Sequence, residues 1–403
     1  MPTEANIPKD DWEQVLLDSV AKRGSGHTPD KKHPEYWDGS IKWISLQDSA
    51  QLDALYIEDT AATITAEGIK NSSAVLHQKG TVVLSRDAGV GKSAIMADDM
   101  AVSQHFMAWT CGQRLDNHFL YYWLQSKKPE FERIANGNTI KTIGLPYFKE
   151  LTIPLPTVEE QKRIASALSD IDTLISSLDQ LVAKKRNIRK ATMQQLLTGQ
   201  SRLPGFSGEW EVRRLGEVFS ISTGRSKSAY IATYGDHWIV DMGSVSTDGK
   251  LLVSKSTDYK ADFLNIGDLV MPKDDIGGGG IIGRVGYIDA DEIYVLSDHV
   301  YRLQANCGNP LFLSFAINGY RINSALRKKV IGSAQLGLSR KSVEEQEISL
   351  PSLEEQTAIA NILSDMDTEL ATLETRRDKA SQLKQGMMQE LLTGRIRLTN
   401  STL

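Results

Sequence analysis

The stretch PTVEEQKRIASALSDIDTLISSLDQLVAKKRNIRKATMQQLLTGQSRL at residues 156–203 decides the fold, because the chain contains it twice. Residues 351–398 read PSLEEQTAIANILSDMDTELATLETRRDKASQLKQGMMQELLTGRIRL and align with it without a gap, at a shift of 195 residues. Of the 48 paired positions 21 are identical, including Glu-Glu-Gln near the start and Leu-Leu-Thr-Gly near the end. A repeat of this length constrains the architecture before any local structure is considered.

The repeat continues more weakly outside these segments. The further matching pairs are Trp12 and Trp210, Leu17 and Leu215, Trp43 and Trp238, His105 and His299, Gly137 and Gly332, and Ile153 and Ile348. The chain therefore reads as one unit written twice, a variable globular part followed by a near-constant segment. We predict globular domains at 1–156 and 204–351 and helical segments at 157–203 and 352–403, related by a pseudo-two-fold internal repeat.

The constant segments have the spacing of long helices. Apolar residues recur every three or four positions, which predicts a seam made of Ile164, Leu168, Ile171, Ile175, Leu178 and Val182 in the first copy and Ile359, Leu363, Met366, Leu370 and Leu373 in the second. Thr157 and Ser352 are candidate N-caps, and a glutamate three residues later has capping-box spacing. With Gly199 or Gly394 as the left-handed stop, we expect the first helix at about 158–198.

So narrow an apolar stripe must be covered by another helix, and the obvious partner is the second copy. We therefore predict that the two helices pair as an antiparallel coiled coil, which would act as a spacer between the globular domains. The alternative, an ordinary core helix, should have a wider apolar stripe. The basic residues at 184–190 are interpreted as a solvated helix face, with phosphate contact as the alternative.

The globular parts mix short β-like runs, at 81–85 and 268–271, with glycine-rich loops and late helices at about 117–124 and 310–317. We therefore expect α+β domains. In each domain a glycine-dense loop follows a strand directly, at 86–92 and 273–280. Glycine at such a place allows a tight turn or a close approach of the backbone to a ligand.

Composition limits the possible functions. The 403 residues carry a net charge of −5, so DNA binding would require positive charge gathered on one face. We find no apolar run of membrane-spanning length and no signal sequence at the start, and we expect a cytoplasmic protein. Only Cys111 and Cys307 are present, too few for a disulfide scaffold or a cysteine zinc site, and we expect both to be small buried residues.

No catalytic or cofactor motif is complete in the sequence. Gly91, Lys92 and Ser93 end like a phosphate-binding loop, but Arg86 stands where its first glycine would be. Asn309-Pro-Leu-Phe312 matches the Asn/Asp-Pro-Pro-Phe/Tyr motif of amino-methyltransferases only in part, because its third residue is leucine. With no metal-ligand cluster or nucleophile elbow either, we predict that the chain is not an enzyme.

Several of these motifs together resemble one known family. Ile153-Pro-Leu-Pro156, Glu159-Glu-Gln161, Leu196-Leu-Thr-Gly199, Arg202-Leu-Pro-Gly-Phe206 and Glu209-Trp-Glu211 are similar to the module borders of type I restriction-modification specificity subunits. Glu35-Tyr-Trp-Asp-Gly39 with Trp43-Ile44 resembles the opening of a target-recognition domain, and the second domain keeps only Trp238-Ile239. The resemblance spans nearly the whole chain.

The resemblance implies a sequence-specific DNA-binding subunit with two target-recognition domains, each reading one half of a split site in double-stranded DNA. It implies as partners two modification (methyltransferase) subunits, which bind S-adenosylmethionine, and restriction (translocase/nuclease) subunits, which use ATP and Mg. No cofactor, metal or membrane is implied for this chain. The alternative from the residues alone is a coiled-coil scaffold whose globular domains bind proteins, which the net acidity favours.

Under the family reading, bases are read by polar side chains on loops. We predict DNA contacts in the first domain from Arg86, Lys92, Asn138 and Lys141, and in the second from Arg225, Lys227, Lys273, Arg284 and Gln335. The alternative for each of these residues is an ordinary solvated surface position.

Overall fold

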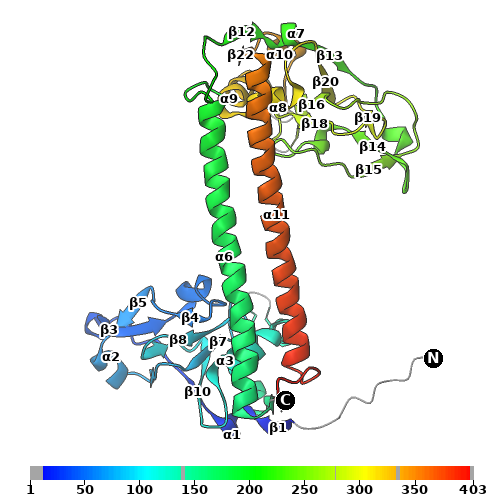
Figure 1. Ribbon diagram of the computed structural model, residues 1–403. Helices are drawn as coiled ribbons and strands as arrows, with labels where there is room; N and C mark the ends of the chain where they lie inside the picture. The colour runs from blue at the N-terminus through cyan, green and yellow to red at the C-terminus, as the bar shows by residue number, and fades with distance from the viewer. Residues whose placement is uncertain (1–11, 138–140, 277, 333–335, 400–403) are drawn as a thin grey trace, which may run out of the picture. The chain divides into compact units, whose positions relative to one another are not determined.

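The computed structural model describes residues 12–137, 141–276, 278–332 and 336–399 (Figure 1). Asn138 and Gln335, two of the predicted DNA contacts, lie outside these ranges. The chain forms two compact units, Met1–Asp179 with Thr375–Leu403, and Gln180–Glu374. Each unit is α+β, as predicted, and each includes a stretch of both long helices, α6 (Val158–Leu196) and α11 (Leu353–Leu391).

The first unit is built around two sheets and a late group of helices. Its five-stranded sheet has the order β2-β10-β7-β8-β4, its four-stranded sheet the order β5-β3-β9-β6, and β1 pairs with β11. Its elements are β1 (Glu13–Leu16), α1 (Leu17–Val20), β2 (Ala21–Ser25), η1 (Pro34–Tyr36), β3 (Trp37–Ile44), η2 (Leu46–Ala50), β4 (Tyr56–Ile57), β5 (Ala62–Ile64), α2 (Ala66–Lys70), β6 (Leu76–His77), β7 (Val82–Ser85), β8 (Ser93–Met96), β9 (Met100–Val102), β10 (Phe106–Cys111), α3 (Asn117–Ser126), α4 (Lys128–Ile134), α5 (Leu145–Lys149) and β11 (Thr152–Leu155).

The second unit has sheets of order β13-β20-β16-β18 and β15-β14-β19, with the pairs β12-β22 and β17-β21. Its elements are β12 (Glu211–Arg214), α7 (Leu215–Val218), β13 (Phe219–Thr223), η3 (Ser228–Tyr230), β14 (His237–Val240), η4 (Met242–Ser244), β15 (Lys255–Thr257), β16 (Leu269–Pro272), β17 (Asp274–Asp275), β18 (Gly286–Tyr287), β19 (Tyr294–Leu296), β20 (Val300–Ala305), α8 (Pro310–Asn318), α9 (Tyr320–Lys328), β21 (Leu336–Gly337), α10 (Arg340–Glu344) and β22 (Glu347–Leu350).

The two units repeat one topology. The antiparallel run β2-β10-β7 of the first corresponds to β13-β20-β16 of the second. The matched tryptophans also occupy equivalent strands, since Trp43 on β3 pairs in parallel with Ala101 and Trp238 on β14 pairs in parallel with Tyr294. The internal repeat in the sequence is therefore a repeat of structure, although the globular parts have diverged.

The long helices start and stop near the predicted residues. Thr157 accepts a hydrogen bond from the Glu160 backbone N–H at 3.3 Å, and Ser352 accepts one from Glu355 at 3.3 Å, as expected of N-caps. Gly199 and Gly394 have φ of +70° and +74°, the left-handed conformation that ends a helix. The predicted capping box is only half formed. The Glu160 and Glu355 side chains do not bind back to the N-cap but accept hydrogen bonds from Arg397 and Arg202.

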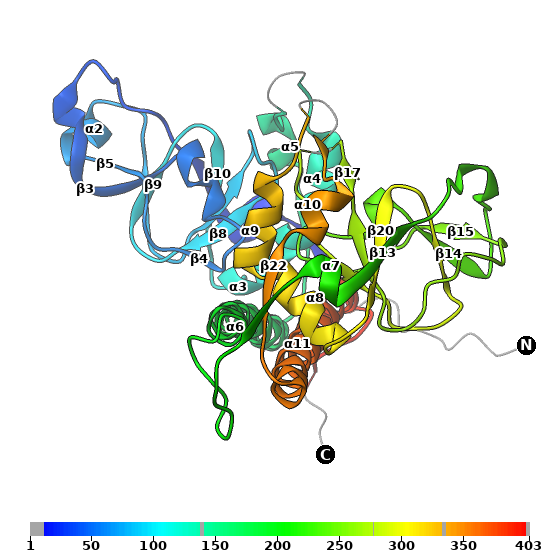
Figure 2. The same cartoon turned by 90° about the horizontal axis from the view of Figure 1, so that it is seen from above.

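Ion pairs join α6 and α11 within each unit. In the first unit Lys384 approaches Asp172 at 2.6 Å, and Arg377 approaches Asp179 at 3.5 Å. Residue numbers on α11 therefore decrease along the pair while those on α6 increase. The two helices therefore run antiparallel there, side by side in both ribbon views (Figures 1 and 2).

In the second unit the basic run on α6 makes the same kind of contact. Lys185 lies 2.7 Å from Glu369, and Arg186 lies 2.5 Å from Glu374. Arg189 also pairs with Asp367. The run was predicted to form a solvated face, and Lys184, Arg186 and Lys190 are indeed exposed, but the acidic side of α11 pairs with Lys185, Arg186 and Arg189.

The predicted seam residues are all buried or half-buried. The first turns of each seam pack into a globular core rather than against the other long helix alone. Ile164 and Leu168 belong to the core around Trp109 of the first unit, and Ile359 and Leu363 to the core around Phe312 of the second. The first turns of each long helix are therefore packed into the core of the globular part that precedes it.

The identical glutamines of the repeat tie each long helix to its globular part. Gln161, fully buried, accepts a hydrogen bond from the Asp116 backbone N–H at 2.7 Å and donates to the Pro156 carbonyl at 2.9 Å. Gln356 accepts from Asn309 N–H at 2.9 Å and donates to the Pro351 carbonyl at 2.9 Å. Since Asp116 and Asn309 cap α3 and α8, one side chain fixes the starts of two helices in each unit.

Candidate nucleic-acid interface

In the first unit, the loop after β7 carries predicted contact residues. Arg86 follows the strand directly, and its backbone N–H donates to the His105 carbonyl at 3.0 Å. The Asp87 carboxylate lies 2.7 Å from His105 Nδ1. Because an ionised carboxylate only accepts hydrogen bonds, Nδ1 carries the proton and Nε2 is the other polar atom of the ring. The loop is thus fixed at its base by one histidine.

A hairpin lies against this loop. Asn136 and Thr142 exchange backbone hydrogen bonds of 3.1 and 2.9 Å, and the Ala88 N–H donates to the Lys141 carbonyl at 3.4 Å. The exposed Lys141 and the half-buried Arg86 therefore stand on neighbouring segments, as the prediction of a shared surface requires. We name Arg86–Ala88, His105, Asn136–Gly137 and Lys141–Thr142 the first recognition edge, and we call the last two pairs of residues the first hairpin.

The second unit repeats these hydrogen bonds with its own residues. The Lys273 N–H donates to the His299 carbonyl at 3.1 Å, and the Asp274 carboxylate lies 2.9 Å from His299 Nδ1. Ile331 and Gly337 exchange backbone hydrogen bonds of 2.9 and 2.8 Å. We name Lys273–Asp275, His299, Ile331–Gly332 and Leu336–Gly337 the second recognition edge, and we call the last two pairs of residues the second hairpin.

Sequence reasoning found the histidine pair but missed the two aspartates that hold it. His105 and His299 are 194 residues apart, whereas Asp87 and Asp274 are 187 apart, because the segments between them differ in length. An ungapped comparison therefore cannot align them. The signal that could have found them is an apolar strand followed by a basic residue and aspartate, which occurs at both places.

The other predicted contacts are placed differently. Arg225 is exposed, and Lys92 donates its ammonium to the Ser49 carbonyl at 3.0 Å. Lys227 is only 2% exposed, with its ammonium 2.8 Å from Asp262 and over the Tyr259 ring. The prediction of a DNA contact at Lys227 is corrected, because a buried and paired cation holds its own loop together and does not reach a ligand.

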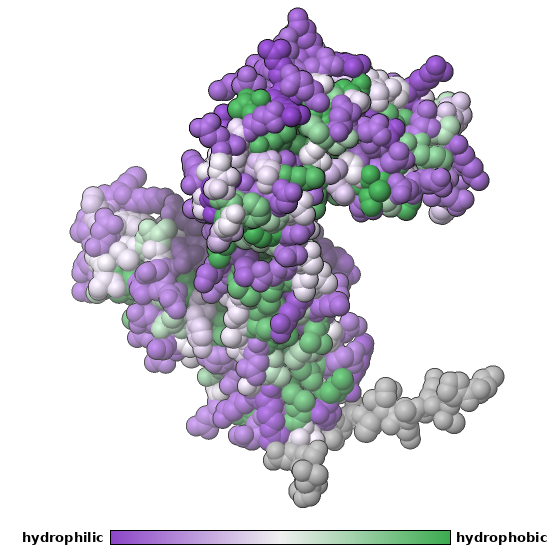
Figure 3. Space-filling model, turned by 45° about the horizontal axis from the view of Figure 1, so that its top comes forward, coloured by the Kyte–Doolittle hydropathy of each residue, from purple (hydrophilic) through white to green (hydrophobic). Residues whose placement is uncertain are grey.

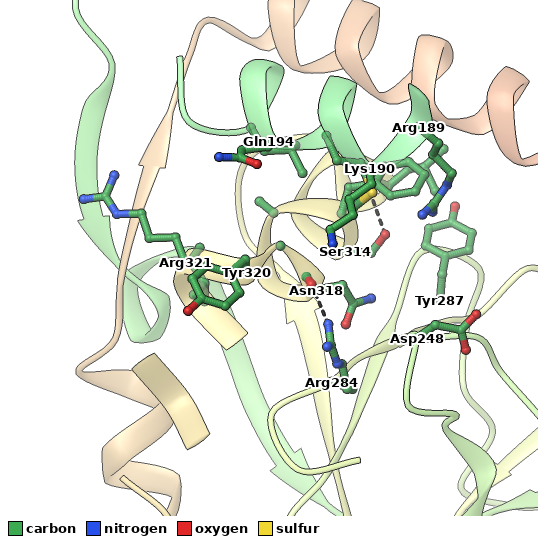
Figure 4. Close-up of a pocket in the computed structure, with 18 of the residues that line it drawn as sticks. Arg189, Lys190, Gln194, Asp248, Arg284, Tyr287, Ser314, Asn318, Tyr320 and Arg321 are labelled. Atoms are coloured by element: carbon green, nitrogen blue, oxygen red, sulfur yellow. Dashed lines mark hydrogen bonds between the residues drawn. The ribbon is translucent and has the colours of Figure 1, made fainter. Parts of the chain in front are cut away.

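Arg284 lies on the loop that follows the second recognition edge. It is half-buried and donates to the Asn318 carbonyl at 2.6 Å (Figure 4). Burial lowers the pKa of Arg284, and the positive charge of Arg327 lowers it further. The negative charge of Asp248 acts in the opposite direction but does not restore the usual pKa.

A large pocket opens beside Arg284 in the second unit, between α6, α8 and the loop 247–251, with a volume of about 1110 Å³. Both signs of charge line it, including Lys190, Arg284, Asp248 and Glu347, and Asp248 lies near Arg284 (Figure 4). Figure 4 shows Arg321 projecting away from the other labelled residues. A wall of mixed charge does not favour the uniformly negative backbone of DNA, so this pocket is not the candidate interface.

Within the described ranges, no group of three or more His, Cys, Asp or Glu side chains is arranged to hold a metal ion. In the same residues, no helix is long and apolar enough to cross a membrane. Cys111 and Cys307 are half-buried rather than fully buried, and burial raises the pKa of the Cys111 thiol to about 12.

Comparison with known protein families gives one match for each of the two repeats. A family model described as the type I restriction modification DNA specificity domain matches residues 9–184 and again residues 207–383. The MjaVIII type I restriction enzyme specificity subunit of Methanocaldococcus jannaschii is 25% identical over 420 residues, covering 97% of this chain and 94% of that one. The MjaIX specificity subunit from the same organism is 29% identical over 237 residues, 54% of either chain.

Solved structures show the same fold. The crystal structure of a type I restriction-modification S subunit from M. genitalium superposes with a TM-score of 0.62 at 18% identity, covering 96% of this chain and 97% of that one. The HsdS subunit from Thermoanaerobacter tengcongensis gives a TM-score of 0.51 at 17% identity, over 98% and 99% of the two chains. With the family model matching both repeats, this chain belongs to the type I restriction-modification DNA specificity domain family.

Proposed function

We propose that this chain is the sequence-reading subunit of a type I restriction-modification complex, catalyses no reaction itself, and reads a split DNA site with one unit per half. The observation that carries the proposal is the duplicated recognition edge. Both edges have one backbone frame, in which a histidine binds the aspartate after a strand, and both place a hairpin beside it.

The side chains on that frame differ between the units. Arg86 in the first edge is Lys273 in the second, and Lys141 in the first hairpin corresponds to Leu336 in the second. Arginine can make a bidentate contact to a guanine edge, whereas lysine acts as a point charge. A common frame with different side chains is what two readers of different half-sites need.

The long helices would set the distance between the half-sites. We infer that α6 and α11 pair along their length as an antiparallel coiled coil, for which the ion pairs within each unit and the burial of the seam are the support. Such a spacer has a fixed length, so the gap between the two halves of the DNA site would be constant.

The same helices are the proposed docking surface for two modification subunits. Leu181 and Ile188, seven residues apart on α6, are 38% and 42% exposed and lie on one face of the helix, where a partner could cover them. At the shift of 195 residues Ile188 aligns with Leu383 on α11, which is also exposed, whereas Leu181 aligns with Arg376, so the two helices offer related but not identical surfaces. S-adenosylmethionine would then be bound by the modification subunits, and ATP and Mg by restriction subunits, in the cytoplasm where chromosomal DNA is accessible.

The test is binding of the chain, assembled with its modification subunits, to duplexes that carry a host methylation site. We expect specific binding that weakens steeply as salt rises, because phosphate contacts release counterions. Scrambling either half of the DNA site should reduce affinity. Changing the number of base pairs between the two halves should abolish sequence-specific binding. Binding that ignores both sequence and salt would contradict the proposal and support a protein scaffold instead.

A further inference from the structure

The second unit contains a long stretch without a single acidic residue. Residues 299–343 include no Asp or Glu, although the whole chain has a net charge of −5. The basic residues of the stretch are Arg302, Arg321, Arg327, Lys328, Lys329, Arg340 and Lys341. It ends in the second hairpin and α10, so it includes part of the second recognition edge.

Some of these cations are neutralised by carboxylates from outside the stretch. Arg302 binds Asp268 at 2.7 Å, Arg340 binds Glu344 at 2.7 Å, and Lys341 lies 3.8 Å from Glu345. The Lys329 ammonium donates to the Ser342 carbonyl at 3.3 Å. Within the described part of the chain, no carboxylate lies within ion-pair distance of the remaining three, Arg321, Arg327 and Lys328.

These three side chains belong to α9, whose other face is buried. Ile322, Asn323 and Leu326 are at most 8% exposed, and their burial anchors the helix on the core. Arg321, Arg327 and Lys328 are exposed. Figure 3 shows hydrophilic residues over most of the visible surface of the second unit. The helix is thus held by its apolar side and presents cations to the solvent.

Two of the cations line a hollow together with Arg284. The hollow has a volume of about 300 Å³, and its lining consists of Arg284, Tyr320, Asn323, Ser324, Arg327 and Lys328. Three of the lining residues are cationic, the others offer hydroxyl or amide groups, and none is acidic. Hydrogen-bond donors and positive charge gathered around one small space are the chemistry that recognises a phosphate group.

The positive charges that line the hollow repel one another. Burial and then the charge of Arg327 lower the pKa of Arg284, so the two guanidinium groups repel each other, and the negative charge of Asp248 offsets this only in part. The buried Nε of Arg284 also has no hydrogen-bond partner in the described structure. An unpaired buried donor beside a like charge is costly, and an anion in the hollow would relieve both costs.

The equivalent place in the first unit lacks this arrangement. The hairpins align Asn136 with Ile331, and at that register Glu132 stands where the second unit has Arg327. Of the nearby lysines, Lys127 just before α4 binds Glu130 at 3.0 Å and Lys128 in α4 binds Asp53 at 2.5 Å, so that among the described residues only Arg133, which aligns with Lys328, keeps a cation at this place. The hollow is therefore not a by-product of the shared fold.

We propose that the hollow lined by Arg284, Arg327 and Lys328 binds a phosphate of the DNA backbone, which makes the second unit the electrostatic anchor of the complex. The inference rests on the proposed function and adds a contact that carries no sequence information. Glycines 278–280 and Gly283 join the second recognition edge to Arg284, so backbone binding and base reading share one loop.

The experiment measures DNA affinity against salt for the chain assembled with its modification subunits. Arg327→Glu installs the residue that the first unit has, and Lys260→Glu reverses the charge of an exposed lysine of the same unit outside the acid-free stretch. We expect Arg327→Glu to weaken specific and non-specific duplexes by the same factor, about tenfold, and to reduce the salt slope by about 1. Lys260→Glu should leave the slope unchanged, and Arg327→Lys should retain most of it.

An unchanged slope in Arg327→Glu would overturn the inference, and so would a loss that depends on the DNA sequence or an equal loss in Lys260→Glu. Inorganic phosphate tests the other source of the ligand. If phosphate raises the unfolding temperature of the wild-type chain and not of Arg327→Glu, while DNA binding is equal in both, the hollow takes a free anion and the inference is wrong. Failure of the wild-type complex to bind DNA would instead refute the proposed function itself.

Discussion

Arg397 binds Glu160 through two hydrogen bonds of 2.8 Å across 237 residues of sequence. The guanidinium also lies over the ring of Trp12, 5.5 Å from its centroid. The second unit has the same contact, in which Arg202 binds Glu355 at 2.7 and 2.6 Å and lies over Trp210. In each unit, an arginine in the segment that follows one long helix therefore binds a glutamate in the first turn of the other long helix. We call each of these arginine–glutamate pairs a clamp.

Removing the clamp should destabilise the unit that it closes. Glu160 is 2% exposed, so Arg397→Ala leaves a buried carboxylate without its charged partner, and we expect a loss of about 3 kcal/mol in the free energy of unfolding. Hydrogen exchange of amides in the first unit measures the loss. The control is Arg395→Ala, because Arg395 is 53% exposed and pairs with Glu390 at the surface, where such pairs contribute about 0–1 kcal/mol. Equal effects would mean that the clamp is not structural.

The same pair predicts a dependence on pH. Burial alone would raise the pKa of Glu160, but the hydrogen bonds and charge of Arg397 outweigh it and the pKa falls below the usual 4.5. Because the folded pKa is lower than the unfolded one, the stabilisation is present above about pH 4.5 and is lost as the pH falls through the folded pKa. The difference in stability between wild type and Glu160→Gln, followed by denaturant titration, should therefore shrink in acid. A difference that grows in acid would show the opposite sign of coupling.

The histidines should act as positioning residues for their own half-site. His105→Ala removes one of the side chains that bind Asp87, another being Arg86 at 3.4 Å, and so loosens the loop of Arg86. Discrimination at one half of the DNA site should therefore fall while the other half is unaffected. His299→Ala should do the reverse through Asp274. Site-by-site methylation rates measure both, and His105→Gln, which keeps a donor, should restore part of the activity. A loss at both halves from either variant would indicate general misfolding.

Arg86 is the residue that we expect to read a base in the first edge. Arg86→Ala should cost about 1 to 3 kcal/mol of discrimination at one position of one half-site, the range for a bidentate contact. Assembly with the modification subunits should be unaffected, as gel filtration can check. Unchanged methylation specificity and affinity would remove Arg86 from the interface.

The helices were predictable because their signals are local and strong. The expected first helix at 158–198 agrees with Val158–Leu196, since a heptad stripe, a capping threonine and a left-handed glycine all act within the segment. The direction of the Glu160 side chain was not predictable, because its partner Arg397 comes from the far end of the chain. Local capping signals cannot anticipate a competing ion pair of that kind.

The sites were harder to predict for a physical reason. Loop cations look alike in sequence, but Lys227 is buried against Asp262 while Arg225, two residues away, is exposed. The charge of residues 201–350 is nearly balanced, 17 basic against 18 acidic, and that average conceals the acid-free stretch 299–343. Only the fold shows which cations share a hollow.

The most direct test of the account is a map of methylated adenines in host DNA, by long-read sequencing, for this chain and for a chimera. In the chimera, residues 13–155 are replaced by the corresponding part of another family member. The account predicts two split motifs that differ in one half and share the other half and the spacing. Motifs that differ in both halves, or in neither, would contradict the claim that each unit reads one half-site.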